Sequence, residues 1–470
     1  MTQHRSHLTS VDPATGITAA TFEAPDDADI NSALDEAFAA QAKWAMTHLS
    51  ERVQLLRSLA RVLRDEKHRF AALITAEMGK PIAEAEAEIE KCALNCDFYA
   101  ANAPAFLAEE VIESNAAHSG VVFEPLGVVL AVMPWNYPFW QLFRFLAPAL
   151  AAGNGVVLKH ASNVPRCALA IEEAVTLAGA PHGLFRTMLV PASRVSALIA
   201  DSRIAAVTLT GSTEVGREVA SDAGRALKRQ VLELGGSDPF IVLADADVQE
   251  AARVATRARF QNVGQSCIAA KRFLVEESVA DEFVAAFSAH VAALVVGDPN
   301  QPETQIGPMA RANLRDELHD QVERTLAAGG ELVLGGSAIE GPGYFYAPTV
   351  IDRVTETMSI FTEETFGPVA AIIRVASAAE AIEKANATEF GLGAALWTRD
   401  LDAARGYARQ LQAGAVFING MVASDPRLPF GGIKASGYGR ELGVYGIREF
   451  TNIKTVWIGP STDTKVELSE

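Results

Sequence analysis

The sequence predicts an α/β protein built around parallel sheets, and three observations support this prediction. Between residues 145 and 245, strand-like and helix-like runs alternate along the chain. A second alternation fills residues 246 to 430, with longer amphipathic helices. The length of 470 residues and the 49% share of hydrophobic residues allow a large core divided between more than one domain. Alternation of this kind is typical of parallel sheets covered by helices on both faces.

Residues 25 to 115 are predicted to form helices that cover one face of the core. Their apolar residues recur with the helical period, as at Val53, Leu56, Leu59, Ala60 and Leu63. Gly79 and Pro81 interrupt this pattern. From 119 to 138 the chain changes to dense β-branched residues with a turn at Pro125 and Gly127, which predicts strands.

The next region carries the clearest alternation of strands and helices. Its runs are, in order, the strand GVVLKH, the helix IEEAVTLAGA, the strands FRTMLV and IAAVTLTG, a helix from about residue 213, and the strand VLELGG. In sheets of this type dinucleotides bind at the carboxyl ends of the strands.

The C-terminal part predicts a second α/β unit, with strands near Phe273 and Val350 and the helix DEFVAAFSAHVAAL. A turn at 391–393 precedes the strand AALWT. The segment 429–441 is dense in glycine, so its backbone must turn tightly. The run FTNIKTVWI at 450–458 alternates and predicts an edge strand, the kind that pairs with another subunit.

Composition excludes several classes of protein. A net charge of −18 and a pI of about 5.0 argue against nucleic acid or an anionic membrane as a partner. The first residues lack an apolar signal-peptide core, and the longest apolar run, 127–135, is far shorter than the roughly 20 residues of a membrane helix. Four cysteines and nine histidines show no metal-ligand spacing, so we expect no metal and a reducing, cytoplasmic location.

The segment FQNVGQSCIAAKR places Cys267 among residues that suit a reactive thiol. Gly264 permits close backbone approach, Gln265 and Ser266 are small or polar, and Lys271 and Arg272 are expected to add positive charge nearby. Chemistry at this cysteine requires the thiolate, which is the nucleophilic form. A lone cysteine is nevertheless more often an inert buried residue, and Cys92, Cys96 and Cys167 are interpreted in that way.

Glu233 is the candidate partner of the cysteine. It lies between Leu232 and Leu234 at the end of an apolar run. Burial there requires either a structural hydrogen-bond partner or a raised pKa. A raised pKa would make Glu233 a general base near neutral pH, able to activate water against an acyl-enzyme.

Six motifs, ELGG, GQSC, PWNYP, TLTGSTEVG, EETFGPV and PFGGIKASGYGRE, occur together over nearly the whole chain. This set resembles the aldehyde dehydrogenase superfamily, and within it the succinate-semialdehyde dehydrogenases. The resemblance implies a Rossmann-like dinucleotide-binding domain over 1–105 and 126–235 and an α/β catalytic domain over 236–450. It also implies oligomerisation strands in 106–125 and 451–470, and hence a homodimer or homotetramer.

The resemblance implies catalytic roles for three residues. Cys267 attacks the aldehyde, Glu233 activates the water that hydrolyses the thioester, and Asn136 stabilises the oxyanion together with the backbone N–H of Cys267. Without the resemblance, Asn136 in PWNYPFW is simply a turn-stabilising residue.

The resemblance also implies a nicotinamide dinucleotide cofactor. TLTGSTEVGR is neither a GxGxxG nor a Walker loop and by itself is a strand-to-helix turn. By resemblance Ser212 and its helix start meet the pyrophosphate, Glu364 the nicotinamide ribose and Phe366 the nicotinamide. The full implied set is Trp135, Lys159, Ser162, Gly211, Ser212, Gly216, Leu234, Glu364 and Phe366.

Lys159 and Ser162 indicate which cofactor is used. Lys159 matches the family lysine that reaches the adenosine ribose, and Ser162 stands where many NAD-using members carry glutamate. Without that carboxylate a 2′-phosphate is not repelled, so we expect NADP, with NAD possible. The alternative is that Ser162 only caps the following turn.

The substrate is inferred from Arg144 and Ser424, which match residues that bind the substrate carboxylate in succinate-semialdehyde dehydrogenases. Gln261 departs from that group, many of whose members carry a second arginine there, and Arg427 or Trp140 are the candidates to compensate. We expect oxidation of succinate semialdehyde. The alternatives are Arg144 as a helix-surface ion-pair residue, a broad-range or glutarate-semialdehyde dehydrogenase, a cysteine hydrolase, and a non-catalytic protein.

Overall fold

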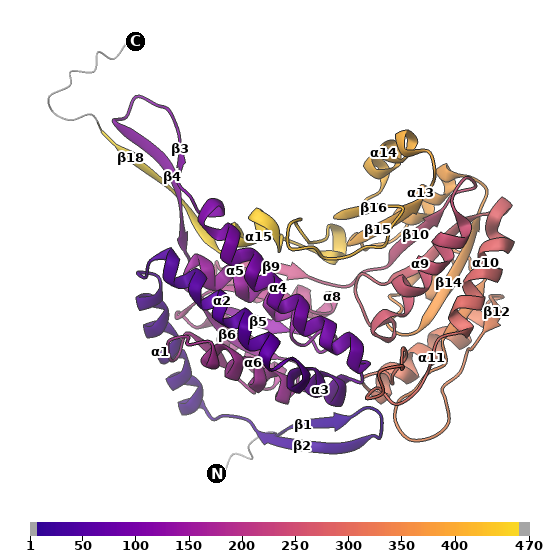
Figure 1. Cartoon of the computed structure of the whole chain (residues 1–470), viewed down its shortest axis with the longest axis horizontal. Helices are drawn as coiled ribbons and strands as arrows, with labels where there is room; N and C mark the ends of the chain where they lie inside the picture. The colour runs from indigo at the N-terminus through magenta and orange to yellow at the C-terminus, as the bar shows by residue number, and fades with distance from the viewer. Residues whose placement is uncertain (1–6, 460–470) are drawn as a thin grey trace.

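The computed structural model describes residues 7–459 and consists of two α/β lobes with a small sheet projecting from the first (Figure 1). The first lobe is drawn in indigo to magenta, and the second mostly in salmon to orange. Residues 460–470, which belong to the predicted oligomerisation strand 451–470, lie outside the described part of the chain, as do the first six residues.

The first lobe contains a six-stranded sheet in the order β17-β9-β8-β5-β6-β7. Five strands are parallel, and β17 pairs antiparallel with β9. The strands are β5 (Val128–Met133), β6 (Gly155–His160), β7 (Phe185–Thr187), β8 (Ile204–Thr210), β9 (Arg229–Glu233) and β17 (Gly437–Tyr438). β5 and β6 are buried at every position, which explains why they are apolar runs rather than alternating ones. The predicted parallel sheet is confirmed.

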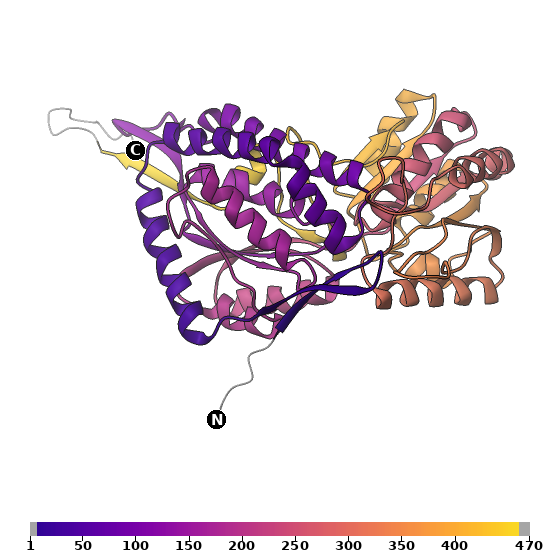
Figure 2. The ribbon, with the colours of Figure 1, turned by 60° about the horizontal axis from the view of Figure 1, so that its bottom comes forward.

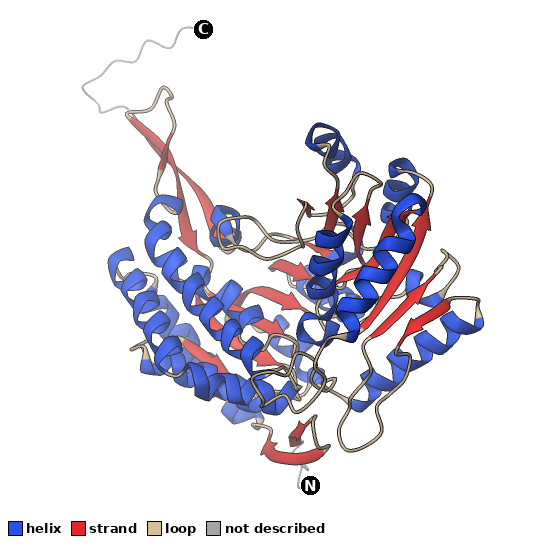
Figure 3. Cartoon of the chain, turned by 45° about the vertical axis from the view of Figure 1, so that its right-hand side comes forward, coloured by secondary structure: helices blue, strands red, loops and turns tan. Residues whose placement is uncertain are grey.

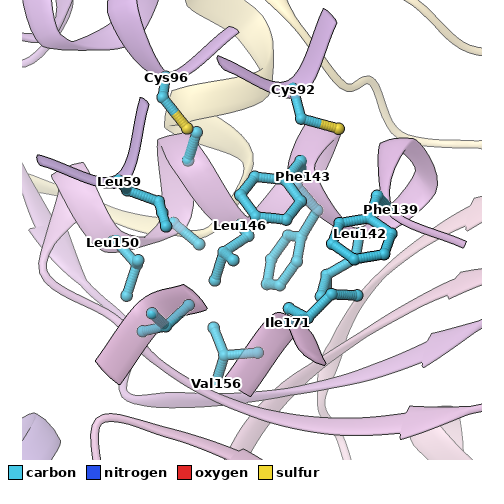
Figure 4. Close-up of a cluster of buried hydrophobic side chains, with 14 of the residues drawn as sticks. Leu59, Cys92, Cys96, Phe139, Leu142, Phe143, Leu146, Leu150, Val156 and Ile171 are labelled. Carbon is cyan, nitrogen blue, oxygen red and sulfur yellow. The ribbon is translucent and has the colours of Figure 1, made fainter. Parts of the chain in front are cut away.

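Helices cover both faces of this sheet. They are α1 (Asp27–Trp44), α2 (Leu49–Asp65), α3 (Lys67–Met78), α4 (Ile82–Phe106), α5 (Trp140–Ala152), α6 (Pro165–Leu177), α7 (Val195–Ala200) and α8 (Thr213–Arg225). Every residue of α5 is buried, because α5 lies between the sheet and the α2–α4 layer. Figure 4 shows Cys92 and Cys96 of α4 in this core, near the ring of Phe143. These two thiols and Cys167 are buried, as predicted, and burial raises the pKa of all three.

The second lobe contains a seven-stranded sheet in the order β12-β13-β14-β11-β10-β15-β16. All neighbours are parallel except β12 and β13. The strands are β10 (Asp238–Val242), β11 (Ala270–Glu276), β12 (Glu331–Leu334), β13 (Thr349–Asp352), β14 (Val369–Val375), β15 (Gly393–Trp397) and β16 (Ala415–Ile418). The helices are α9 (Val248–Phe260), α10 (Glu277–Ala292), α11 (Ala312–Ala327), α12 (Ser359–Thr362), α13 (Ala378–Asn386) and α14 (Leu401–Gln410).

A three-stranded antiparallel sheet extends away from the first lobe (Figure 3). It consists of β3 (Glu110–Val111), β4 (His118–Pro125) and β18 (Thr451–Ile458), and β18 pairs with β4 along its whole length. β18 lies at the edge of the sheet and exposes Ile453, Trp457 and Ile458. The prediction of an edge strand at the end of the chain is confirmed for 451–458.

The chain passes from the first lobe to the second between β9 and β10, and two further segments join the lobes. The hairpin of β1 (His7–Asp12) and β2 (Ile17–Glu23) runs along the first lobe toward the second (Figure 2), where Tyr344 N–H donates to the Pro13 carbonyl over 3.0 Å. After the second sheet the chain returns to the first lobe through β17 and α15 (Gly443–Glu449). There the Tyr99 hydroxyl donates to the Gly443 carbonyl over 3.1 Å. The predicted partition, which stays a prediction, assigned this return segment to the catalytic part.

Candidate active site

Two cavities meet at Cys267. One, of about 380 Å³, is enclosed mainly by α4, α5, the end of α9 and residues 421–424; we call it the α4–α5 cavity. The other, of about 200 Å³, lies between the two lobes at the carboxyl ends of β8 and β9; we call it the interlobe cavity. Cys267 and Gln141 line both. A nucleophile at this position reaches a ligand in either cavity.

The loop that carries Cys267 is held in an unusual backbone conformation. Between α9 and the cysteine, Asn262, Val263 and Gly264 all have positive φ, at 56°, 57° and 70°. The Asn262 side chain donates to the Asn136 and Gln265 carbonyls at 2.9 and 3.0 Å and so fixes the turn. A side chain at position 264 would collide with the Gly367 carbonyl, so the predicted close backbone approach at Gly264 is confirmed.

The two basic residues after the cysteine have different roles. Lys271 Nζ donates to the Ser266 and Cys267 carbonyls at 3.0 and 2.8 Å and lies 3.6 Å from Glu364. Arg272 instead donates to carbonyls of Ser237, Lys384 and Ala385 in the second lobe. The expectation that both add positive charge beside the thiol therefore holds for Lys271 and is wrong for Arg272, whose guanidinium is used in packing.

The Cys267 thiol is not activated by its fixed surroundings. Burial raises its pKa to about 12, although Arg144 and Lys271 act in the opposite direction. The thiolate is the reactive form, so the proton must leave to a base when substrate is present.

Asn136 lies beside the cysteine, in the loop between β5 and α5. Its Nδ2 donates to the Gln265 carbonyl over 3.0 Å, which leaves the second amide hydrogen for a ligand in the interlobe cavity. Its Oδ1 is buried and accepts no hydrogen bond within residues 7–459. The structure thus brings Asn136 and Cys267 together, as predicted.

Glu233 is placed differently. It ends β9 and is buried, but its carboxylate packs against Gly431 and lines neither cavity. Neither carboxylate oxygen has a hydrogen-bond partner among the described residues. Burial, and the nearby Glu441 carboxylate, raise the pKa of Glu233. Of the two alternatives left open by the sequence, the raised pKa is therefore favoured. The carboxylate is close enough to Cys267 for its charge to raise the pKa of the thiol.

The interlobe cavity collects most of the residues expected around the cofactor. Its walls include Trp135, Gly211, Ser212, Leu234, Glu364 and Phe366. Ser212 caps α8 by accepting from the Val215 N–H, and the other free N–H groups of that helix start suit an anionic group. The Gly236 N–H donates to Glu364 over 3.0 Å, and the Trp135 and Phe366 rings meet edge to face at 5.7 Å. An anion-binding helix end, a held carboxylate and an aromatic wall fit a dinucleotide.

Three of the expected cofactor residues lie outside this cavity. Gly216 has a packing role, because a side chain there would collide with Leu234. Lys159 is the penultimate residue of β6 and is 8% exposed, and its Nζ bonds to no residue that the structure describes. Ser162, just beyond it, is exposed. A cation and a hydroxyl at the end of β6 fit a phosphate on the adenosine side.

The α4–α5 cavity contains both expected substrate residues. Arg144 donates from Nε to Glu441, and its guanidinium lies 4.4 Å from the centre of the Phe430 ring. The interpretation of Arg144 as a helix-surface ion-pair residue is wrong about the surface, since Arg144 is 1% exposed. Ser424 accepts from Lys91 Nζ over 2.6 Å. Gln261 and Trp140 also line this cavity, whereas Arg427 is exposed and paired with Asp425.

Comparison with known proteins identifies the family. A model described as "Aldehyde dehydrogenase family" matches residues 1–456. The chain belongs to the aldehyde dehydrogenase family. It is 51% identical to a probable succinate-semialdehyde dehydrogenase [NADP(+)] of Synechocystis sp. over 96% of this chain and 99% of that protein. It is 49% identical to succinate-semialdehyde dehydrogenase [NADP(+)] 1 of Mycobacterium tuberculosis over the same shares of the two chains.

Solved structures agree with this assignment. The succinic semialdehyde dehydrogenase of Streptococcus pyogenes, solved in complex with NADP+, superposes with a TM-score of 0.94 at 39% identity, covering 96% of this chain and 100% of that one. The resemblance inferred from the six motifs and the predicted fold class are both confirmed. None of the helices in the described part of this aldehyde dehydrogenase combines the length and apolar character that crossing a bilayer requires. Within the same part, no group of three or more His, Cys, Asp or Glu side chains is placed to hold a metal ion.

Sequence reasoning missed several residues of the site. Lys91 and Glu441 reach the α4–α5 region from segments far from the cysteine in sequence. Arg311 lines the interlobe cavity, with its guanidinium 5.7 Å from the centre of the Trp135 ring. The sequence offers little signal for Lys91, which follows Glu90 between the buried Ile89 and Cys92, as a pair of charges on a helix surface would.

Proposed function

We propose that this aldehyde dehydrogenase oxidises succinate semialdehyde to succinate, with NADP as the hydride acceptor. The observation that carries this proposal is the meeting of two unlike cavities at one sulfur. The interlobe cavity offers a helix start for the pyrophosphate and an aromatic wall for the nicotinamide of a dinucleotide, and the α4–α5 cavity has a basic and hydroxylic wall that fits a short anion. The relatives from Synechocystis and Mycobacterium tuberculosis are named as succinate-semialdehyde dehydrogenases that use NADP(+), which supports the same substrate and cofactor here.

The chain's own groups account for the chemistry. The Cys267 thiolate adds to the aldehyde carbon, and Asn136 Nδ2 and the Cys267 N–H stabilise the oxygen anion that forms. One such donor typically contributes about 3 kcal/mol to lowering the barrier. Bound NADP supplies the acceptor for the hydride that leaves this carbon. A thioester on Cys267 results, and water hydrolyses it to succinate and the free thiol.

Glu233 is the proposed base for the hydrolytic step. Its raised pKa suits proton transfer near neutral pH, and it directly precedes Leu234 and Gly235, which line the interlobe cavity. To act, its carboxylate must turn from Gly431 toward Cys267. Two unpartnered oxygens favour that mobility, because no hydrogen bond to a described residue has to break.

The proposal extends to location and assembly. We place the enzyme in the cytoplasm, because its four cysteines are all free thiols. We also propose a homodimer or homotetramer joined through the projecting sheet, since the outer edge of β18 is unpaired within residues 7–459 and exposes three large apolar side chains. Light scattering on the protein as it elutes from a size-exclusion column measures the number of subunits.

A panel of short aldehydes, each run with NADP and with NAD, tests the proposal. Following absorbance at 340 nm, we expect the highest kcat/KM for succinate semialdehyde with NADP. Glutarate semialdehyde and the uncharged butanal provide the chain-length and charge controls. An equal rate for butanal would favour the broad-range alternative, a tenfold preference for NAD would remove the cofactor inference, and ester hydrolysis without any change at 340 nm would favour a cysteine hydrolase.

A further inference from the structure

Lys91 is a cation in the α4–α5 cavity to which the mechanism above assigns no role. It lies on α4, and it lines the same cavity as Cys267 and Ser424. Building on the proposed function, we propose that Lys91, together with Ser424, binds the distal carboxylate of the substrate and sets the preference for anionic aldehydes. Lys91 thereby adds a cation without an ion-pair partner to the wall in which the resemblance already places Arg144.

The charge of Lys91 is not balanced by an ion pair. No carboxylate among the described residues lies within 4.0 Å of its Nζ, whose contacts are the Ser424 hydroxyl at 2.6 Å and the centre of the Trp140 ring at 4.2 Å. The two acidic residues whose charges act on Lys91, Glu88 and Asp425, already have other partners. Glu88 pairs with Lys80 and accepts the N–H groups of Phe139 and Trp140, and Asp425 pairs with Arg427.

Arg144 differs from Lys91 in this respect. Its guanidinium is fully buried and paired with Glu441, and it stacks on Phe430. The Glu441 carboxylate offsets part of its charge, although Arg144 still lowers the pKa of both Cys267 and Lys91. A second carboxylate therefore gains less beside Arg144 than beside an ammonium group that has no ion-pair partner. Gln261 lines the same cavity and contributes no charge.

The donors of Lys91 and Ser424 match a carboxylate. The ammonium group has three N–H bonds, of which Ser424 takes one, and the Ser424 hydroxyl, having accepted that bond, still has its own hydrogen to donate. Two ammonium hydrogens and one hydroxyl hydrogen therefore remain available to donate to the oxygens of a substrate carboxylate. The Trp140 ring beside them keeps water away on one side, which strengthens the charge-assisted bonds. Burial lowers the pKa of Lys91 to about 8, and a bound anion would raise it again.

The test compares Lys91→Met with the wild-type enzyme on succinate semialdehyde and on butanal, with saturating NADP. We expect kcat/KM for succinate semialdehyde to fall about 10- to 100-fold, the range of a lost charge-assisted hydrogen bond, mainly through KM. We expect kcat/KM for butanal to stay within about threefold. Lys91→Arg should recover most of the loss, and Ser424→Ala should show a smaller loss in the same direction.

Matched measurements separate the possible failures. Lys43→Met removes an equal charge from an exposed position on α1 and should leave both aldehydes unaffected. Equal losses on both aldehydes, or no loss on either, would overturn the role of Lys91. If the wild-type enzyme itself failed to prefer succinate semialdehyde over butanal, the proposed function would fail instead. Competitive inhibition by succinate then tests Lys91 separately, with a weaker inhibition constant in Lys91→Met supporting the proposal and an unchanged one overturning it.

Discussion

The two cavities that meet at Cys267 are built in different ways. The interlobe cavity is defined by backbone features: strand ends of β8 and β9, the start of α8 and glycines at 211 and 235. The α4–α5 cavity is defined by long side chains that converge from helices of the first lobe and from loops of the second. The shape of the interlobe cavity therefore depends on local sequence, and the lining of the α4–α5 cavity depends on how distant segments of the chain pack.

This difference decides what a substitution does on each side. A change in the interlobe cavity alters a shape common to any dinucleotide, so it affects all substrates alike. A change in the α4–α5 cavity alters a charge or a hydrogen bond that only some aldehydes use. The sulfur itself belongs to both cavities, and its loss should remove the distinction altogether.

The largest expected effect is therefore that of Cys267→Ala. Removing the nucleophile should lower aldehyde oxidation by about a thousandfold or more for every aldehyde, measured by absorbance at 340 nm. Cys96→Ala is the matched control, because Cys96 is buried in the hydrophobic core of the first lobe and lines neither cavity. It should keep kcat/KM and lower only thermal stability, by an amount typical of a small cavity. Comparable losses of activity in the two variants would contradict the assignment of the nucleophile.

The same contrast explains how much was predictable from the sequence. Strands such as GVVLKH and IAAVTLTG appear at β6 and β8, because a parallel strand buried on both faces must be a continuous apolar run. The motif residues Ser212, Leu234 and Glu364 reach the interlobe cavity because each lies at or near the end of a regular element. Strands and the residues at their ends can therefore be predicted from local sequence.

Contacts between distant segments could not be predicted from local sequence. The ion pair of Arg144 with Glu441 and the contact of Lys91 with Ser424 join residues hundreds of positions apart. Periodicity gives a helix face but not the side chains that meet it. Arg144 was a candidate only through the family resemblance, and no pattern in the sequence indicated Lys91. The direction of the Glu233 side chain was equally hidden, since β9 fixes only where its backbone ends.

The next largest effect separates the two half-reactions at the sulfur. In Glu233→Gln we expect a burst of NADPH equal to the wild-type burst, followed by turnover slowed about a thousandfold, because Glu233 is assigned to the hydrolytic step alone. Rapid mixing at 340 nm measures both phases. Since burial raises the pKa of Glu233, its base form is present only above that raised value, so wild-type turnover should increase as pH rises through it. A variant without a burst would contradict this division of roles.

The smallest expected effect lies at the adenosine end, where Ser162→Glu should convert the cofactor preference. Ser162 is exposed, three residues beyond Lys159 at the end of β6. A carboxylate about 4 Å from a 2′-phosphate would be repelled by about 4 kcal/mol at an effective dielectric constant near 20, and about a third of that corresponds to a tenfold loss of affinity. We therefore expect kcat/KM with NADP to fall about tenfold while the value with NAD stays within about twofold. Ser162→Gln adds similar bulk without charge and should keep the NADP preference. The same loss in both variants would show that the end of β6 selects its cofactor by shape, as the interlobe cavity does. A loss in Ser162→Glu alone would show that charge makes the selection there, as in the α4–α5 cavity.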